Sequence, residues 1–253
     1  MSTTLSLPRV QAEENAAKPE TTYWRILDDR ILHKILLVLV PLSLIAIAVG
    51  LYMAVFYAPR EATMGDAQRI FYFHVPSAWI GFLSFFIVFL ASIMFLLKRT
   101  RKWDALALSA AEIGVVFTTL VLLTGPIWAK AAWGTYWVWD ARLTTTLVLW
   151  LIYVGYLMLR SSVDDMKRAR MAAVLGIIGF LDVPIIYLSV TWWRTMHPTL
   201  LVNETGGLDA AMRATLMVAL LSFTLLFAWM LLLRVRLEQK RDMLAHLRAQ
   251  EEV

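Results

Sequence analysis

The segment WGTYWVWDARLT, residues 133–144, combines aromatic rings, a carboxylate and a guanidinium in a short connection between two apolar runs. Its four rings belong to Trp133, Tyr136, Trp137 and Trp139. In water so many exposed rings would form an aggregation-prone patch, so they predict burial in a membrane interface or contact with a flat apolar ligand. Their density exceeds that of an ordinary interface belt and favours the ligand. If 133–139 is helical, the first three rings share one face, and a short helix in the interface plane fits.

Two of the four histidines, His74 in RIFYFHVPSAW and His197 in SVTWWRTMHPT, lie at the ends of apolar runs on the same predicted side as this segment. His33 and His246 fall in the polar tails. Neutral imidazole binds iron well, and two imidazoles on opposite faces of a porphyrin form a six-coordinate site. A single histidine at a membrane edge is more often a hydrogen-bonded interface residue. The pairing of two with the aromatic segment favours haem.

Haem propionates need cationic partners, and five basic side chains fall on that side: Arg60, Arg69, Lys130, Arg142 and Arg194. Asp140 has two interpretations of equal weight. It caps a helix or pairs locally with Arg142, or it orients a ligand histidine by a hydrogen bond.

The elements that must position these residues are membrane helices. The chain is 60% apolar and only 17% charged, which is typical of a membrane-embedded protein. Runs long enough to span a bilayer occur at 35–57, 77–97, 105–127, 143–159, 171–190 and 214–233. The predicted fold class is an all-α integral membrane protein, a single bundle of six transmembrane helices over 35–233. A polar tail (1–34) precedes it and a charged tail (234–253) follows.

The distribution of basic residues predicts the orientation. Eighteen Lys and Arg lie in the tails and even-numbered loops, and six lie in the odd-numbered loops. Because translocated loops carry fewer of them, both termini should be cytoplasmic and the tryptophan-rich loop should face outward. The first tail is too long and acidic for a signal peptide. The net charge of +5 lies at membrane boundaries and gives no reason to expect nucleic acid.

The composition also excludes several chemistries. The chain has no cysteine, so it forms no disulfide, cysteine-ligated iron–sulfur cluster or thiolate-ligated haem. It has no suitably spaced pair of carboxylates in one loop and no Gly-rich phosphate loop. We therefore expect a non-catalytic protein that depends on partners for energy.

Two acidic residues interrupt apolar runs: Glu112 in the third and Asp182 in the fifth. Buried carboxylates are costly and often functional. No Lys or Arg falls inside a run to pair with them, so we expect protonation or hydrogen bonds to Thr118, Thr119 or Ser189. A role in packing or subunit contact is favoured over proton transport.

The segment GPIWAKAAWGTYWVWDARLT, with FHVP before it and WWRTMHP after it, resembles the CcmC family of cytochrome c maturation. These are six-span members of the Trp-rich (WWD) haem-handling superfamily, and the resemblance covers nearly the whole chain. The larger CcmF and CcsA types share the loop but are longer or carry further membrane histidines. Two positions depart from the family pattern: Tyr136, where Trp is common, and Ala129, where Gly is common.

The resemblance implies that haem b (iron protoporphyrin IX) is bound transiently, with His74 and His197 as axial ligands of the metal. It also implies delivery to the chaperone CcmE at the outer face of the bacterial inner membrane, in a complex with the ABC transporter subunits CcmA and CcmB and with CcmD. The complete candidate cofactor-binding set is His74, His197, Trp133, Tyr136, Trp137, Trp139, Asp140, Arg142, Arg69 and Lys130.

Two alternatives remain. A b-type electron-transfer cytochrome would hold its haem deep within helices, whereas His74 and His197 lie at helix ends, which suits release. A cofactor-free interaction or channel subunit would use its aromatics only for packing and would be colourless.

Overall fold

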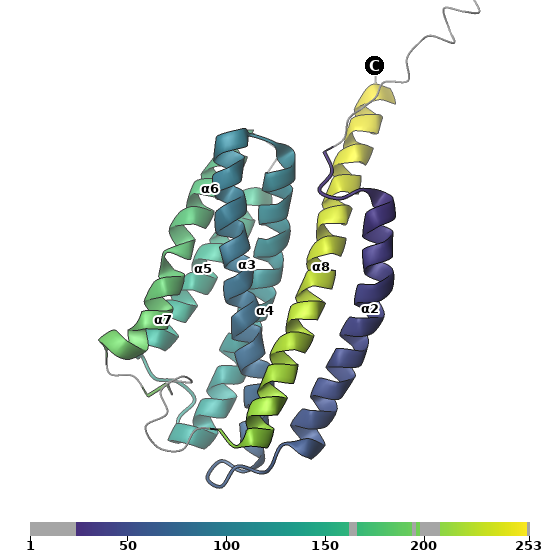
Figure 1. Ribbon diagram of the computed structural model, residues 1–253. Helices are drawn as coiled ribbons and strands as arrows, with labels where there is room; N and C mark the ends of the chain where they lie inside the picture. The colour runs from purple at the N-terminus through teal and green to yellow at the C-terminus, as the bar shows by residue number, and fades with distance from the viewer. Residues whose placement is uncertain (1–23, 162–165, 194–195, 198–207, 252–253) are drawn as a thin grey trace, which may run out of the picture.

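The computed structural model describes residues 24–161, 166–193, 196–197 and 208–251 (Figure 1). Within them, six helical segments are long and apolar enough to cross a membrane: Asp29–Tyr57, Asp66–Lys98, Arg101–Trp133, Ala141–Arg160, Lys167–Trp192 and Ala210–Glu251. Each contains one of the six apolar runs. The prediction of an all-helical bundle with six spans is therefore confirmed.

The helices are α2 (Asp29–Tyr52), α3 (Phe71–Lys98), α4 (Arg101–Trp133), α5 (Ala141–Ser161), α6 (Met166–Phe180), α7 (Asp182–Trp192) and α8 (Ala210–Glu251). A π-helical turn, η1 (Met53–Tyr57), extends α2, and a 3-10 turn, η2 (Asp66–Ile70), leads into α3. The most extensive contacts are between α3 and α4 and between α2 and α8. The fifth span is divided between α6 and α7, which meet at Leu181.

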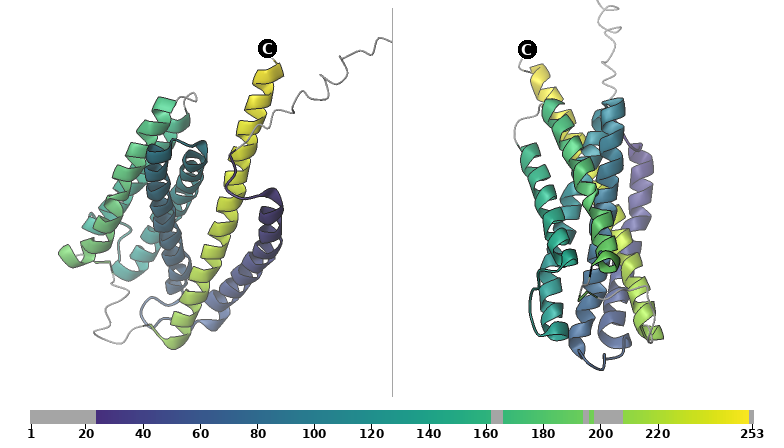
Figure 2. Two further views of the ribbon diagram at one scale, coloured as in Figure 1. Left: turned by 45° about the horizontal axis from the view of Figure 1, so that its top comes forward. Right: turned by 90° about the vertical axis from the view of Figure 1, so that its left-hand side faces the viewer.

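Consecutive spans run in opposite directions, so the connections alternate between the two ends of the bundle (Figures 1 and 2). The start of α3, the 134–140 connection and the start of α8 lie at the bottom of Figure 1, and the end of α7 lies toward the same end of the bundle, higher and at the left. We call this the tryptophan end. The start of α4, the end of α5 and the last part of α8 lie at the opposite end, which we call the ionic end.

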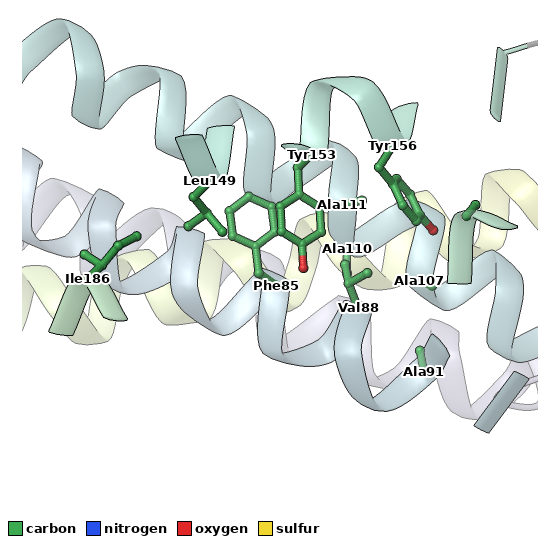
Figure 3. Close-up of a cluster of buried hydrophobic side chains, with 11 residues drawn as sticks. Phe85, Val88, Ala91, Ala107, Ala110, Ala111, Leu149, Tyr153, Tyr156 and Ile186 are labelled. Atoms are coloured by element: carbon green, nitrogen blue, oxygen red, sulfur yellow. The ribbon is translucent and has the colours of Figure 1, made fainter. Parts of the chain in front are cut away.

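The core between α3, α4 and α5 is tightly packed (Figure 3). The Phe85 ring stacks on the Tyr153 ring with centroids 3.7 Å apart. Opposite them, α4 presents the small residues Ala107, Ala110 and Ala111, which let membrane helices approach closely. A Cβ added to Gly114 would lie 2.5 Å from Phe85 Cε1, so only glycine fits there. This core gives α3 and α4 a fixed relative position.

Seven charged side chains from α4, α5 and α8 form a network at the ionic end: Arg101, Asp104, Glu112, Arg160, Arg234, Glu238 and Asp242. Asp104 is 2% exposed and accepts hydrogen bonds from Arg160, whose Nη2 lies 2.8 Å from Asp104 Oδ2, and from Arg101. Arg101 also donates to Glu238 at 3.2 Å and to Asp242 at 2.8 Å. The network ties α8 to the beginning of α4.

The expectation that no basic side chain reaches Glu112 is wrong. Arg234 Nη2 donates to Glu112 Oε1 at 2.8 Å, and Arg234 Nη1 donates to Glu238 Oε2 at 3.0 Å. Arg234 follows the last apolar run, and its long side chain extends from α8 to the carboxylate on α4. The expected hydrogen bonds to Glu112 from Thr118 and Thr119 are not formed, because these hydroxyls donate to Gly114 O and Val115 O.

Asp182 begins α7 at the break in the fifth span. Its Oδ2 is buried and has no hydrogen-bond partner among the described residues. The expected hydrogen bond from Ser189 is not formed, because that hydroxyl donates to Ile186 O at 2.7 Å.

Candidate functional site

The 134–140 connection begins where a glycine ends α4. Gly134 adopts φ +76°, its N–H donates to Lys130 O at 3.1 Å, and Lys130 Nζ donates to Gly134 O at 2.7 Å. A left-handed glycine with such bonds is a common helix terminus. The following residues to Asp140 are not helical. The short interface helix considered for 133–139 is therefore not present.

The aromatic side chains of this connection are partly open to the surroundings. Trp139 is 76% exposed and Tyr136 is 60% exposed. Trp137 packs edge-to-face on Trp139, with ring centroids 5.5 Å apart, and its indole Nε1 is buried without a hydrogen-bond partner among the described residues. Lys130 Nζ lies 5.4 Å from the centroid of the Tyr136 ring. The connection thus presents exposed aromatic rings together with the Trp137 indole N–H, which has no hydrogen-bond partner among the described residues.

Asp140 is the N-cap of α5. Its Oδ1 accepts a hydrogen bond from the backbone N–H of Leu143 at 2.8 Å, which satisfies one of the otherwise unpaired donors of the first helical turn. The structural interpretation of Asp140 as a helix cap is therefore confirmed.

Replacing Asp140 tests whether the cap is its main role. We expect Asp140→Ala to lower the free energy of unfolding by about 1 kcal/mol, whereas Asp140→Asn should preserve it, because Asn is as good an N-cap as Asp. Thermal unfolding in detergent measures both. Haem retention that fell equally in the two variants would instead indicate a role for the carboxylate charge.

His74 is the fourth residue of α3 and contacts α4. Its Nδ1 lies 2.9 Å from Thr124 Oγ1, and the Thr124 hydroxyl donates to Leu120 O at 2.7 Å. A Cβ added to Gly125 would lie 3.2 Å from His74 Cε1. The imidazole is therefore held against α4 by two consecutive residues of that helix.

His197 follows α7 and contacts the start of α5 and the end of α4. Its Nδ1 lies 3.2 Å from Arg142 Nη1 in the first turn of α5. Its ring lies edge-to-face to Trp133, with centroids 6.4 Å apart, and Trp133 packs on Trp128 at 5.6 Å. His197 and Arg142 both interact electrostatically with His74. The structure thus brings the two predicted histidines, Arg142 and Trp133 together at the tryptophan end.

The other predicted cations are placed differently. Arg69 donates through Nη1 to Ala54 O, and its Nε lies 3.2 Å from Asp66 Oδ1. It therefore fastens the end of the first span rather than contacting either histidine. Arg60 also pairs with Asp66, at 3.5 Å. Arg194 lies outside the described residues.

A family model described as Heme exporter protein C (CcmC) matches residues 16–250. The chain belongs to this family. Relatives named Heme exporter protein C include that of Bradyrhizobium diazoefficiens, 42% identical over 199 residues that cover 78% of this chain and 75% of the relative. That of Haemophilus influenzae is 35% identical over 229 residues, or 89% and 91% of the two chains. That of Escherichia coli K12 is 37% identical over 195 residues, or 77% and 79%.

Membership of the CcmC family confirms the resemblance inferred from the histidine and tryptophan motifs. It also agrees with the six spans, so the chain is a multi-pass membrane protein of the CcmC type. Among its described residues, no group of three or more His, Asp or Glu side chains could hold a metal ion.

Sequence reasoning missed three residues at the tryptophan end. Thr124 and Gly125 contact His74, and Gln68 Oε1 accepts a hydrogen bond from Trp128 Nε1 at 3.2 Å. The sequence TGP, residues 124–126, could have indicated the first two of these residues. A polar and a small residue stand there beside a proline in an otherwise apolar run.

Proposed function

We propose that this protein binds haem transiently at its tryptophan end and presents it for transfer to a CcmE-type haem chaperone. The observation that carries this proposal is the convergence of two imidazoles, one guanidinium and a group of accessible aromatic rings from three separate parts of the chain. The name of the matching family, Heme exporter protein C, supports the same cargo.

The residues present fit a haem in their chemistry. His74 and His197 would supply the axial nitrogens, and the rings of Tyr136, Trp137 and Trp139 would cover a porphyrin face. Propionates are carboxylates and need donors or cations. Arg142 lies beside His197, and Lys130 and the unpaired indole N–H of Trp137 lie in the same connection. In this proposal Asp140 acts indirectly, by fixing the start of the helix that carries Arg142. Arg69 acts indirectly too, by fastening the first span.

The side of the membrane follows from charge. Basic residues are concentrated in the tails and in the connections at the ionic end, which supports a cytoplasmic position of that end by the positive-inside rule. The tryptophan end then faces outward from the bacterial inner membrane. The chain itself has no nucleotide-binding loop, so in this proposal energy comes from CcmA and CcmB, with CcmD as a further subunit.

The decisive experiment is an absorption spectrum of the purified protein with haem, before and after mixing with haem-free CcmE-type chaperone. We expect a six-coordinate haem spectrum that moves to the chaperone fraction on separation. A haem that changes redox state reversibly but never moves would indicate an electron-transfer cytochrome. A protein that takes up no haem would indicate a cofactor-free subunit. Either result would overturn the proposal.

A further inference from the structure

The hydrogen bonds around His74 determine which ring nitrogen carries the proton. Thr124 has a single hydroxyl hydrogen, which it donates to Leu120 O at 2.7 Å. The same hydroxyl oxygen lies 2.9 Å from His74 Nδ1. Because the oxygen has no second hydrogen to give, it must accept, and His74 Nδ1 must be the donor. A neutral imidazole protonated at Nδ1 keeps its lone pair at Nε2.

We propose that Thr124 is a positioning residue that selects this tautomer of His74 and turns Nε2 toward the haem iron. The proposal rests on the proposed function, because it assigns the ligand atom within the same site. An imidazole that ligates a metal through one nitrogen usually donates a hydrogen bond from the other, and that bond fixes its tautomer and orientation. Here the acceptor is the Thr124 hydroxyl oxygen.

The surrounding structure keeps the ring in one orientation. Gly125 leaves the ring just enough room, since a Cβ there would lie 3.2 Å from His74 Cε1. His74 and Thr124 belong to α3 and α4, the helix pair with the most extensive contacts in the bundle. The ligand nitrogen is therefore fixed by helix packing rather than by a loop.

His197 is arranged differently. A guanidinium can only donate, so the 3.2 Å contact between Arg142 Nη1 and His197 Nδ1 makes Nδ1 the acceptor. A neutral His197 ring in this state therefore carries its proton on Nε2. His197 can therefore ligate iron only after it gives up its contact with Arg142, whereas His74 already has Nε2 available for a metal while Nδ1 donates a hydrogen bond.

The test is removal of the Thr124 hydroxyl with little change of shape. Thr124→Val should accelerate haem loss to excess apomyoglobin by about 10- to 100-fold, the usual effect of deleting a partner that orients a metal ligand. Thr124→Ser, which restores the hydroxyl, should return the rate to near that of the unmodified protein. The matched control is Thr118→Val on the same helix, because the Thr118 hydroxyl donates to Gly114 O in the same way. This variant should lose haem at the rate of the unmodified protein.

A second measurement needs no haem. In haem-free protein labelled with ¹⁵N-histidine, the His74 signals, identified by their absence from His74→Ala, should show a protonated Nδ1 and an unprotonated Nε2. In Thr124→Val this preference should disappear. A protonated Nε2 in the unmodified protein, or unchanged haem loss from a folded Thr124→Val, would overturn the inference. Haem binding unaffected by His74→Ala would instead overturn the proposed function, so the two failures are distinguishable.

Discussion

Replacement of both His74 and His197 by alanine is expected to give a folded protein that no longer retains haem through purification. The rings of the 134–140 connection would still offer apolar contact, but no imidazole at this end would ligate the iron. Neither histidine belongs to the buried core of the bundle, so the fold should survive. Haem content per polypeptide, from the absorption spectrum and a total-protein assay, measures the effect.

The matched control is replacement of His33 and His246, which belong to α2 and to the distal part of α8. It removes the same number of imidazoles and should leave the haem content unchanged. Each single variant at the tryptophan end should bind haem more weakly and with an altered spectrum. Full haem content in the double variant would contradict axial ligation by these two residues.

The largest loss of stability should come from Asp104→Ala at the ionic end. Asp104 is 2% exposed and accepts hydrogen bonds from both Arg160 and Arg101. Its removal leaves the largely buried Arg160 guanidinium without a carboxylate partner among the described residues, and breaking one partner of a buried ion pair typically costs about 3–5 kcal/mol. Unfolding in a denaturing detergent titration measures the change.

The matched control is Asp66→Ala. Asp66 also pairs with two arginines, Arg60 and Arg69, but its side chain is 65% exposed, and exposed pairs contribute only about 0–1 kcal/mol. Arg160→Met added to Asp104→Ala should recover part of the lost stability, because the uncompensated charge is removed. A loss no greater than that of Asp66→Ala would show that solvent reaches the Asp104 site.

The fold was largely predictable because a bilayer permits few backbone arrangements. Apolar runs of about twenty residues must become helices, and all six did. The sequence predicted the ends of these helices less well. The third span was expected to end at residue 127, but α4 continues to Trp133, because Pro126 is accommodated within the helix and only Gly134, with its positive φ, ends it. The break at Leu181 was not predicted, although Pro184 stands three residues later.

The sequence predicted which residue types would gather at the candidate site, but it did not predict which side chains would contact one another. The proximity of His74 and His197 follows from their places at the same ends of antiparallel spans. The Arg234 contact to Glu112 joins residues 122 positions apart and depends on the orientation of α8, which no local pattern specifies. Thr124 was missed because a lone threonine in an apolar run usually bonds only to its own helix, as Thr118 does.

The length of α8 has a mechanical consequence. At 42 residues it measures about 63 Å, roughly twice the thickness of the hydrocarbon layer. It contains neither proline nor glycine and so lacks the usual positions for a kink. One stiff rod therefore starts at the tryptophan end and carries Arg234 and Glu238 of the ionic network in its second half. A force that tilts the last part of this helix would therefore be transmitted along its length to the tryptophan end.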